Sequence, residues 1–414
     1  MIHKLKFYTL LFSVLLSILA ISCKNNHSTD PDAKNNPYVV MLSLDGFRWD
    51  YPQKANTPNL DRIAEIGVRA ESLRPCFPTK TFPNHYSIAT GLYPDNHGIV
   101  LNNFYDSAMD VSYSLGNRES VENGYFYGGE PIWVTAENQG VITASYFWVG
   151  SEAPVKGVQP TYWKRYEHKF PFTQRVDSII AWLSLPEEKR PHLITWYMDE
   201  PDSKGHQLGP DNPDLLPVIS YLDSLVGDFM FKLNRLEIGR NVNFIITSDH
   251  GMGQISPDRV VWLADHINPD HISRINGSNP VYCLSASPGY NEEIGNKLNN
   301  IDHISSWKHG QLPERLHYGT NSRTGDFVII ADSGWSVTIN SNPQKYSGGA
   351  HGYDNRNRDM HAIFYAVGPA FKTGYLQPTF NNIDIYSLIA EIMCIKPAHV
   401  DGNINHVSGM LSNK

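Results

Sequence analysis

Carboxylates stand directly after three strongly apolar runs of the sequence, and histidines accompany two of them. The runs are residues 38–44, 192–198 and 242–248. Runs of this length, rich in β-branched and aromatic residues, are typical of buried strands in a parallel sheet. Open α/β sheets bind ligands beyond the carboxyl ends of their strands, so we expect Asp45, Asp202 and Asp249-His250 to share one rim. Carboxylates and imidazoles gathered in this way suit a divalent metal, most naturally zinc.

Two further segments carry side chains that can bind a metal ion. Asp202 and His206 are four residues apart, so a single helical turn or a tight loop can aim both at one ion. His351 lies in the segment Gly348-Gly349-Ala350-His351-Gly352, where glycines allow the backbone to approach an ion closely. Alone, each pattern is equally compatible with a solvated pair or a glycine-rich turn.

A threonine is the candidate nucleophile. Thr79 stands just before a predicted helix at residues 82–90, and helix N-termini present free N–H groups to anions. A threonine hydroxyl is a poor nucleophile until it loses its proton, and coordination to a metal achieves this. The alternative is that Thr79 only caps the helix.

Six segments in order along the chain are similar to the motifs of one enzyme family. They are Asp45-Gly46, Pro78-Thr79-Lys80-Thr81-Phe82-Pro83-Asn84-His85, His97-Gly98-Ile99-Val100-Leu101-Asn102-Asn103, Glu200-Pro201-Asp202-Ser203-Lys204-Gly205-His206, Ser248-Asp249-His250-Gly251 and His351-Gly352-Tyr353-Asp354. Together they resemble the nucleotide pyrophosphatase/phosphodiesterase family of the alkaline phosphatase superfamily. The resemblance runs from about residue 37 to nearly the end and covers a catalytic domain alone.

The resemblance implies two zinc ions per chain and a covalent phospho-threonine intermediate. One zinc would be held by Asp45, Thr79, Asp249 and His250, and the other by Asp202, His206 and His351. Asn102 would donate a hydrogen bond to a phosphoryl oxygen, although Asn103 beside it leaves an ambiguity. Thr81 is the rival of Thr79 for the nucleophile. His85 and His97 are assigned structural roles.

The resemblance also implies a substrate that is a nucleotide phosphodiester or pyrophosphate, cleaved to a nucleoside 5′-monophosphate. We expect aromatic side chains to stack on the base, and the candidates are Trp163, then Tyr162, with Phe82 and Tyr105 as further walls. The alternative for these aromatics is a place in the core, since large aromatic side chains dominate cores.

Three other functions stay open at this stage. Cys76-Phe77-Pro78-Thr79-Lys80 faintly resembles a sulfatase motif, and a sulfatase or phosphomonoesterase can use the same fold, although the arginine fork that a phosphate dianion requires is not evident. A phospholipid or glycerophosphocholine diesterase of the same family needs an aromatic and acidic cage for choline. A non-enzymatic surface lipoprotein is the third alternative.

Predicted helices and strands alternate along the chain around these residues. Helices are predicted at residues 57–67, 82–90, 215–236 and 383–393, and a fourth buried strand at 361–367. Residues 260–340 have shorter strands and read as an inserted α+β subdomain capping the sheet. The expected fold is an α/β, alkaline-phosphatase-like three-layer sandwich with a mostly parallel sheet, formed by residues 37–410.

Composition and the N-terminal residues indicate the class of protein and its location. The chain has 41% hydrophobic residues and a net charge of −8, so we expect a globular protein without a surface for nucleic-acid polymers. Residues 1–22 resemble a lipoprotein signal peptide, with Cys23 as the lipid-bearing residue and 23–36 as a flexible tether. We therefore expect an exported, membrane-anchored bacterial lipoprotein. Cys76, Cys283 and Cys394 are expected to act as small buried hydrophobes.

Overall fold

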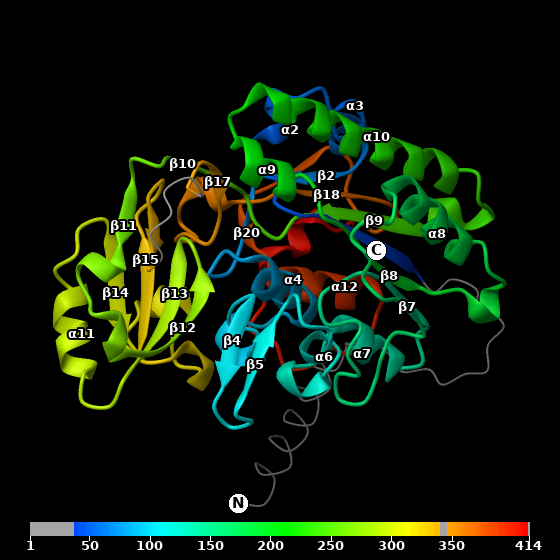
Figure 1. The fold of residues 1–414 in the computed structure, drawn as a ribbon. Coiled ribbons are helices and arrows are strands. Elements are labelled where there is room, and N and C mark those ends of the chain that lie inside the picture. The colour runs from blue at the N-terminus through cyan, green and yellow to red at the C-terminus, as the bar shows by residue number, and fades with distance from the viewer. Residues whose placement is uncertain (1–36, 340–345, 413–414) are drawn as a thin grey trace, which may run out of the picture. The chain divides into compact units, whose positions relative to one another are not determined.

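A central eight-stranded sheet organises the part of the chain that the computed structural model describes, residues 37–339 and 346–412. The strand order is β19-β2-β18-β9-β1-β8-β6-β7 (Figure 1). The strands are β1 (Tyr38–Leu44), β2 (Val68–Ala70), β6 (Thr143–Tyr146), β7 (Tyr162–Lys164), β8 (Leu193–Met198), β9 (Val242–Thr247), β18 (Phe364–Val367) and β19 (Tyr375–Gln377). The five strands from β9 to β7 are parallel, whereas β18 is antiparallel to both β9 and β2.

Helices cover both faces of this sheet, and β1 shows why. Successive side chains of a strand point to opposite faces, and all seven residues of β1 are buried. Val39 and Met41 join one hydrophobic core, while Val40, Leu42 and Leu44 join another. The helices that complete the first core are α4 (Thr81–Thr90), α7 (Ile132–Glu137) and α12 (Asp384–Ile392), and those of the second are α3 (Pro58–Ile66), α8 (Phe172–Leu183) and α10 (Leu216–Leu233). Figure 1 shows the two groups on opposite sides of the sheet, which confirms the predicted three-layer α/β class.

The predicted long helices and buried strands are present with small differences in length. Helix α3 lies between Thr57 and Gly67 as expected, and α4 begins at Thr81 and ends at Gly91, whose φ is +66°. The fourth strand is shorter than predicted, because a 3₁₀ turn at Arg358–Met360 precedes it and β18 begins only at Phe364. Helices α7 and α8 and the short helices α2 (Tyr51–Lys54), α5 (Pro94–His97) and α6 (Arg118–Val121) were not predicted. Helix α9 (Asp202–Leu208) is the helical turn that the spacing of Asp202 and His206 allowed.

The inserted region has a sheet and a hydrophobic core of its own. Its antiparallel strands follow the order β12-β13-β15-β14, and helix α11 (Asn291–Leu298) packs on them. The strands are β12 (Ile272–Ser278), β13 (Val281–Ala286), β14 (Ile304–Lys308) and β15 (Phe327–Ala331). Its β12–β13 turn contacts the large domain, where Gly277 N–H donates to Asn103 Oδ1 at 3.1 Å and Lys80 Nζ donates to Asn279 O at 2.8 Å. The insertion therefore reaches residues next to the start of α4.

Four small strand pairs complete the fold. They are β3 (Leu73–Arg74) with β20 (Phe380–Asn381), β4 (Asn103–Asp106) with β5 (Val111–Ser114), β10 (Gly253–Ile255) with β17 (Gly348–Ala350), and β11 (Val260–Trp262) with β16 (Ser336–Thr338).

Some predictions concern parts of the chain at its margins. The signal peptide, Cys23 and the tether lie in residues 1–36, outside the described residues. Among the described helices, none combines the length and apolar character that crossing a membrane requires. Cys76 and Cys283 are buried, as expected, whereas Cys394 is exposed.

Candidate active site

Three loops that follow parallel strands converge at one rim of the sheet. The backbone N–H of Asp202 donates to Asp45 O at 3.0 Å, and that of Gly46 donates to Asp249 Oδ1 at 3.1 Å. Gly46 has φ +68°, and a Cβ there would lie 2.9 Å from Cα of Asp202. The close approach of the β1 and β8 loops therefore requires glycine at this position. As the strand order predicts, the three carboxylates lie together.

Three histidines face these carboxylates, and each is held from behind. Nδ1 of each ring lies 2.8 Å from a backbone carbonyl: His206 binds Gly349 O, His250 binds Gly251 O and His351 binds Thr79 O. Because a carbonyl only accepts, the proton lies on Nδ1 and the lone pair lies on Nε2. This arrangement is typical of histidines that bind metals through Nε2.

Helix α9 and strand β17 bring the second part of the site together. Asp202 and His206 lie one turn apart on α9, with Oδ1 and Nε2 separated by 3.5 Å, and His351 Nε2 lies 3.6 Å from the same Oδ1. A Cβ on Gly349 would be 2.6 Å from Gly205 O. The glycine-rich segment thus lets β17 approach α9 closely enough for His206 and His351 to share one carboxylate.

Buried carboxylate oxygens in the cluster lack hydrogen-bond partners among the described residues. They are Asp45 Oδ1, Asp202 Oδ1 and Asp249 Oδ2. Burial, and then repulsion from Asp249 and Asp202, raises the pKa of Asp45 well above its usual value. Burial alone would raise the pKa of Asp249 as well, but His250 and His85 outweigh it and hold that pKa well below its usual range. Buried negative charge without donors is stabilised by cations, so this donor set fits metal ions.

Two groups of atoms in the cluster each have the spacing of a metal site. Within each group, ligand atoms lie within 4.8 Å of one another, and the groups are Asp202, His250 and His351, and Asp45, His85 and Asp249. His250 lies between the groups, because Nε2 is 3.0 Å from Asp249 Oδ2 and its ring stacks on His351 at 3.5 Å. His250 could therefore serve an ion held by either group. His206 lies next to the first group, because its Nε2 is close to Asp202 Oδ1.

The two threonines of the Pro78–Thr81 loop have different environments, and the prediction that Thr79 reaches the site is wrong. Thr79 is fully buried; its hydroxyl donates to Tyr353 O at 3.1 Å and accepts from Gly352 N–H at 2.9 Å. Both of its hydrogen-bonding directions are therefore used by the backbone. Thr81, the first residue of α4, lines the cavity instead, and its Oγ1 is 3.2 Å from His250 Nε2.

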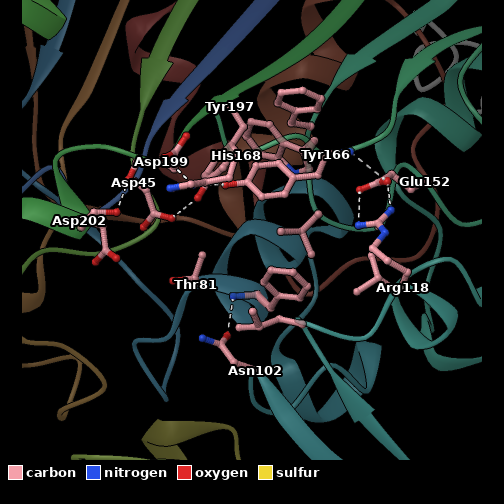
Figure 2. Close-up of a pocket in the computed structure, with 18 of the residues that line it drawn as sticks. Asp45, Thr81, Asn102, Arg118, Glu152, Tyr166, His168, Tyr197, Asp199 and Asp202 are labelled. Atoms are coloured by element: carbon pink, nitrogen blue, oxygen red, sulfur yellow. Dashed lines mark hydrogen bonds and ion pairs between the residues drawn. The ribbon is translucent and has the colours of Figure 1, made fainter. Parts of the chain in front are cut away.

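Asn102 lies on the opposite side of Thr81 from the carboxylates of the rim (Figure 2). Its Oδ1 accepts a hydrogen bond from the backbone N–H of Phe82 at 2.9 Å, which directs the amide NH₂ group away from that contact and leaves it available at the cavity wall (Figure 2). Asn103 instead binds Gly277 of the insertion. Of the two asparagines, Asn102 is therefore the one that lines the cavity.

The two histidines assigned structural roles differ in their distance from the cluster. His97 bonds to Ser87 Oγ at 2.9 Å, and burial lowers the pKa of its imidazole to about 3. His85 is also buried, but its Nδ1 lies 3.0 Å from Thr81 O and 3.3 Å from Asp249 Oδ2. His85 therefore supports both the threonine and a carboxylate of the rim.

A cavity of about 280 Å³ opens from the rim toward an aromatic wall. We use "aromatic wall" for Phe82, Phe147 and Tyr166, which line it together with Leu115, Val121 and Val149. Arg118 and Glu152 close its far end as an ion pair, and Arg118 also binds Glu122 Oε1 at 2.8 Å (Figure 2).

Of the four aromatic side chains predicted to bind the base, Phe82 alone lines the cavity. Tyr162 and Trp163 lie on the edge strand β7, where Tyr162 packs beside Trp182 and Trp163 is 37% exposed. Tyr105 binds Asp110 and lies under Arg274. Tyr166, three residues beyond Trp163, supplies the wall instead. Strand β7 ends at Lys164, so Tyr166 lies beyond the sheet, where its ring lines the cavity.

Comparisons with known proteins point in one direction. Residues 39–354 match the model of a family described as type I phosphodiesterase / nucleotide pyrophosphatase. The chain is 36% identical over 390 residues to ectonucleotide pyrophosphatase/phosphodiesterase family member 3 of Rattus norvegicus, covering 91% of this chain and 44% of the relative. It is 36% identical over 400 residues to family member 1 of Homo sapiens, covering 94% of this chain and 43% of the relative. The chain thus spans less than half the length of these curated relatives.

A solved structure of a murine relative covers this chain more evenly. Murine ectonucleotide pyrophosphatase/phosphodiesterase 5 superposes with a TM-score of 0.87 at 34% identity, over 91% of this chain and 100% of that chain. That structure is described as inactive, with a threonine-to-alanine substitution, and in complex with AMP.

Proposed function

The chain belongs to the type I phosphodiesterase / nucleotide pyrophosphatase family, and on that basis we propose that it hydrolyses nucleotide phosphodiester or pyrophosphate bonds to nucleoside 5′-monophosphates. The observation that carries the proposal is the position of Thr81. Its hydroxyl lies at the start of α4, beside His250 and across from Asn102, at the edge of a cavity with room for a nucleotide.

The proposed cofactor is a pair of zinc ions. Asp45, Thr81, Asp249 and His250 would hold one, and Asp202, His206 and His351 the other. When bound, zinc would lower the pKa of a coordinated hydroxyl or water and neutralise charge on phosphoryl oxygens. The orphaned carboxylate oxygens support this assignment, as do the three histidines whose Nδ1 is held by a carbonyl so that Nε2 faces the carboxylates.

In the proposed reaction, Thr81 is the nucleophile. Its Oγ loses a proton and forms a bond to phosphorus while the bond from phosphorus to the leaving oxygen breaks, which leaves a phospho-threonine diester. Water then attacks phosphorus, the bond to Oγ breaks, and Thr81 regains its proton as the 5′-monophosphate leaves. The amide of Asn102 donates to a phosphoryl oxygen whose charge increases in the transition state.

The aromatic wall is the proposed site of the base. Phe82 directly follows Thr81 in the chain. A single nucleotide can therefore stack its base on the Phe82 ring while its phosphate lies at the Thr81 hydroxyl. Tyr166 packs at the cavity with Phe147 beside it, 5.2 Å between ring centroids. AMP in the murine relative's structure supports a nucleotide ligand for this fold.

A product assay tests the proposal. Purified protein with zinc is incubated with ATP, a dinucleotide, a UDP-sugar, glycerophosphocholine, and 4-nitrophenyl phosphate and sulfate. We expect nucleoside 5′-monophosphates from the nucleotides at rates well above those on the other compounds. Faster release of phosphocholine or glycerophosphate from glycerophosphocholine would favour the lipid-type alternative. The pairing of Glu152 with Arg118 opposes that outcome, since the acid is not free to bind choline.

Cys76 offers no support for a sulfatase. Its thiol bonds to Asn382 Oδ1 at 3.1 Å, away from the cavity, and burial raises its pKa to about 12.

We also propose that Cys23 carries the lipid of an exported bacterial lipoprotein. The apolar run that precedes Cys23 and the polar stretch that follows it support this proposal. Multiple acyl chains are needed for stable attachment. The test compares wild type with Cys23→Ser in membrane and soluble fractions, and equal retention of the variant in the membrane would contradict the proposal.

A further inference from the structure

A buried arginine forms an ion pair with an aspartate that lines the cavity between the rim and the aromatic wall. Arg175 of α8 is fully buried and donates to Asp199 Oδ1 at 3.0 Å. The same guanidinium donates to the carbonyls of Tyr197 at 3.1 Å, Phe170 at 3.1 Å and His168 at 3.2 Å. A planar guanidinium with four such partners fixes both the acid and the loop that faces it.

This loop presents a histidine whose ring is exposed but held in one orientation. The side chain of His168 is 63% exposed and lines the cavity, and its Nδ1 lies 3.1 Å from Asp199 Oδ2 and 3.2 Å from Tyr166 Oη. Since a carboxylate only accepts, Nδ1 carries a proton. Nε2 makes no hydrogen bond within the described residues, so the ring offers one polar atom to a ligand.

The position of His168 corresponds to the middle of a 5′-nucleotide. On one side it touches Tyr166 of the aromatic wall, and on the other Asp199, which follows β8 (Figure 2). Tyr197 of the same strand donates to Asp45 Oδ2 on the rim at 2.5 Å. In a 5′-nucleotide the sugar joins the base to the phosphate, so it must pass the wall between Tyr166 and Asp45.

His168 also changes the charge that an anionic substrate meets. A bare Asp199 carboxylate on the wall would repel a phosphodiester, but Arg175 binds one oxygen and His168 covers the other. The carboxylate of Asp199 therefore orients the imidazole of His168, and the imidazole is the group that a substrate meets.

We propose that His168 is a specificity-determining residue that binds the sugar hydroxyls of a nucleotide substrate through Nε2. The inference rests on the proposed function, because it requires a base on the aromatic wall and a phosphate at Thr81. Arg175 and Asp199 act as positioning residues, since they hold the ring and do not contact the sugar.

Kinetics on paired substrates test this role. The substrates are adenosine 5′-(4-nitrophenyl phosphate), its 2′,3′-dideoxy analogue, and bis(4-nitrophenyl) phosphate, which has no sugar. For His168→Ala we expect KM for the adenosine ester to rise about five-fold, the effect of one lost hydrogen bond, with kcat nearly unchanged. The rate on the sugar-free ester should not change. Lys169→Ala, at the exposed neighbouring residue, is the matched control and should behave as wild type.

Two conservative variants separate the role of Nδ1, which is held by Asp199, from the role of Nε2, which is proposed to bind the sugar. Asn in place of His168 retains a donor near the position of Nδ1 but lacks Nε2, so His168→Asn should resemble His168→Ala. Gln reaches the position of Nε2, so His168→Gln should restore most of the affinity. Removing the sugar hydroxyls should weaken wild type as much as the Ala variant is weakened and should have no further effect on that variant.

The outcomes distinguish this inference from the proposed function. Additive effects of His168→Ala and of the dideoxy substrate, or equal loss on the sugar-free ester, would overturn the role of His168. Calorimetric binding of AMP and of 2′,3′-dideoxy-AMP gives a readout without turnover. If wild type binds AMP more tightly than the dideoxy compound but His168→Ala does not, and no ester is cleaved, the proposed reaction fails while the sugar contact stands.

Discussion

The rim and the aromatic wall are built by different parts of the fold, and they differ in how tightly they are held. The carboxylate and histidine ligands proposed for the rim follow central strands, lie on α9 or follow β17, and all except Asp202 and His206 are buried. Backbone groups hold Asp249 and the histidines in place. The wall comes from α4 and from segments outside the central strands, with Tyr166 only partly buried. The proposed role of the rim therefore depends on fixed positions of its side chains. The aromatic wall instead provides a surface against which a substrate can pack.

The largest effect should come from removing metal from the rim. A chelator should abolish nucleotide hydrolysis, because the seven proposed ligands cannot activate Thr81 without a cation, and zinc should restore it. Rates on adenosine 5′-(4-nitrophenyl phosphate), together with metal analysis, measure this. Full activity in protein shown to be free of metal would contradict the proposal that the rim acts through bound metal ions.

The next largest effect separates the two threonines of one loop. Thr81→Ala should lower kcat by at least about a thousand-fold, since no other hydroxyl occupies its place. Six proposed ligands remain, so zinc content should stay close to that of wild type. Thr81→Ser retains the hydroxyl and should keep partial activity.

Thr79 is the matched control in that experiment. Thr79→Ala leaves the N–H of Gly352 without its acceptor and should cost about 2 kcal/mol of unfolding free energy, with far less loss of turnover. Thermal unfolding and single-turnover kinetics on both variants decide the matter. A trapped phospho-adduct on Thr79 would reverse the assignment.

A smaller loss is expected where the rim meets the wall. Asn102→Ala should lower kcat about a hundred-fold, the typical effect of removing one transition-state donor, while KM changes little. Asn103→Ala, which only loses its bond to Gly277, should affect stability more than rate. Equal kinetic effects of the two variants would show that Asn102 acts by supporting Phe82 and not by donating to the phosphate.

The smallest effect belongs to the wall. Tyr166→Ala should raise KM for the adenosine ester about ten-fold with a minor change in kcat, because base stacking stabilises substrate and transition state alike. Trp163→Ala should leave both parameters near wild type, since that ring does not line the cavity. A larger effect at Trp163 than at Tyr166 would restore the prediction made from the sequence.

The contrast also explains which features were predictable. Buried runs that end in acids predicted a parallel sheet and the convergence of Asp45, Asp202 and Asp249, because strand period and strand end are local properties of the sequence. The alkaline-phosphatase-like arrangement was implied by the resemblance of the motifs to a known family. Thr79 and Thr81 are two residues apart in one loop, and only a contact with Gly352, 273 residues away, distinguishes them. Tyr166 was missed for a similar reason, since its direction depends on Arg175 holding the following loop.

The contacts of Thr79 with the segment from His351 to Tyr353 have a consequence for how the protein matures. During synthesis, the loop that bears Thr79 and Thr81 emerges long before its partners, and β2 must wait for β18, which pairs with it from residues 365–366. A nascent chain therefore cannot assemble the site before the segment from His351 to Ala366 has been made. The proposed hydrolysis of nucleotides would therefore begin only once this late segment is in place.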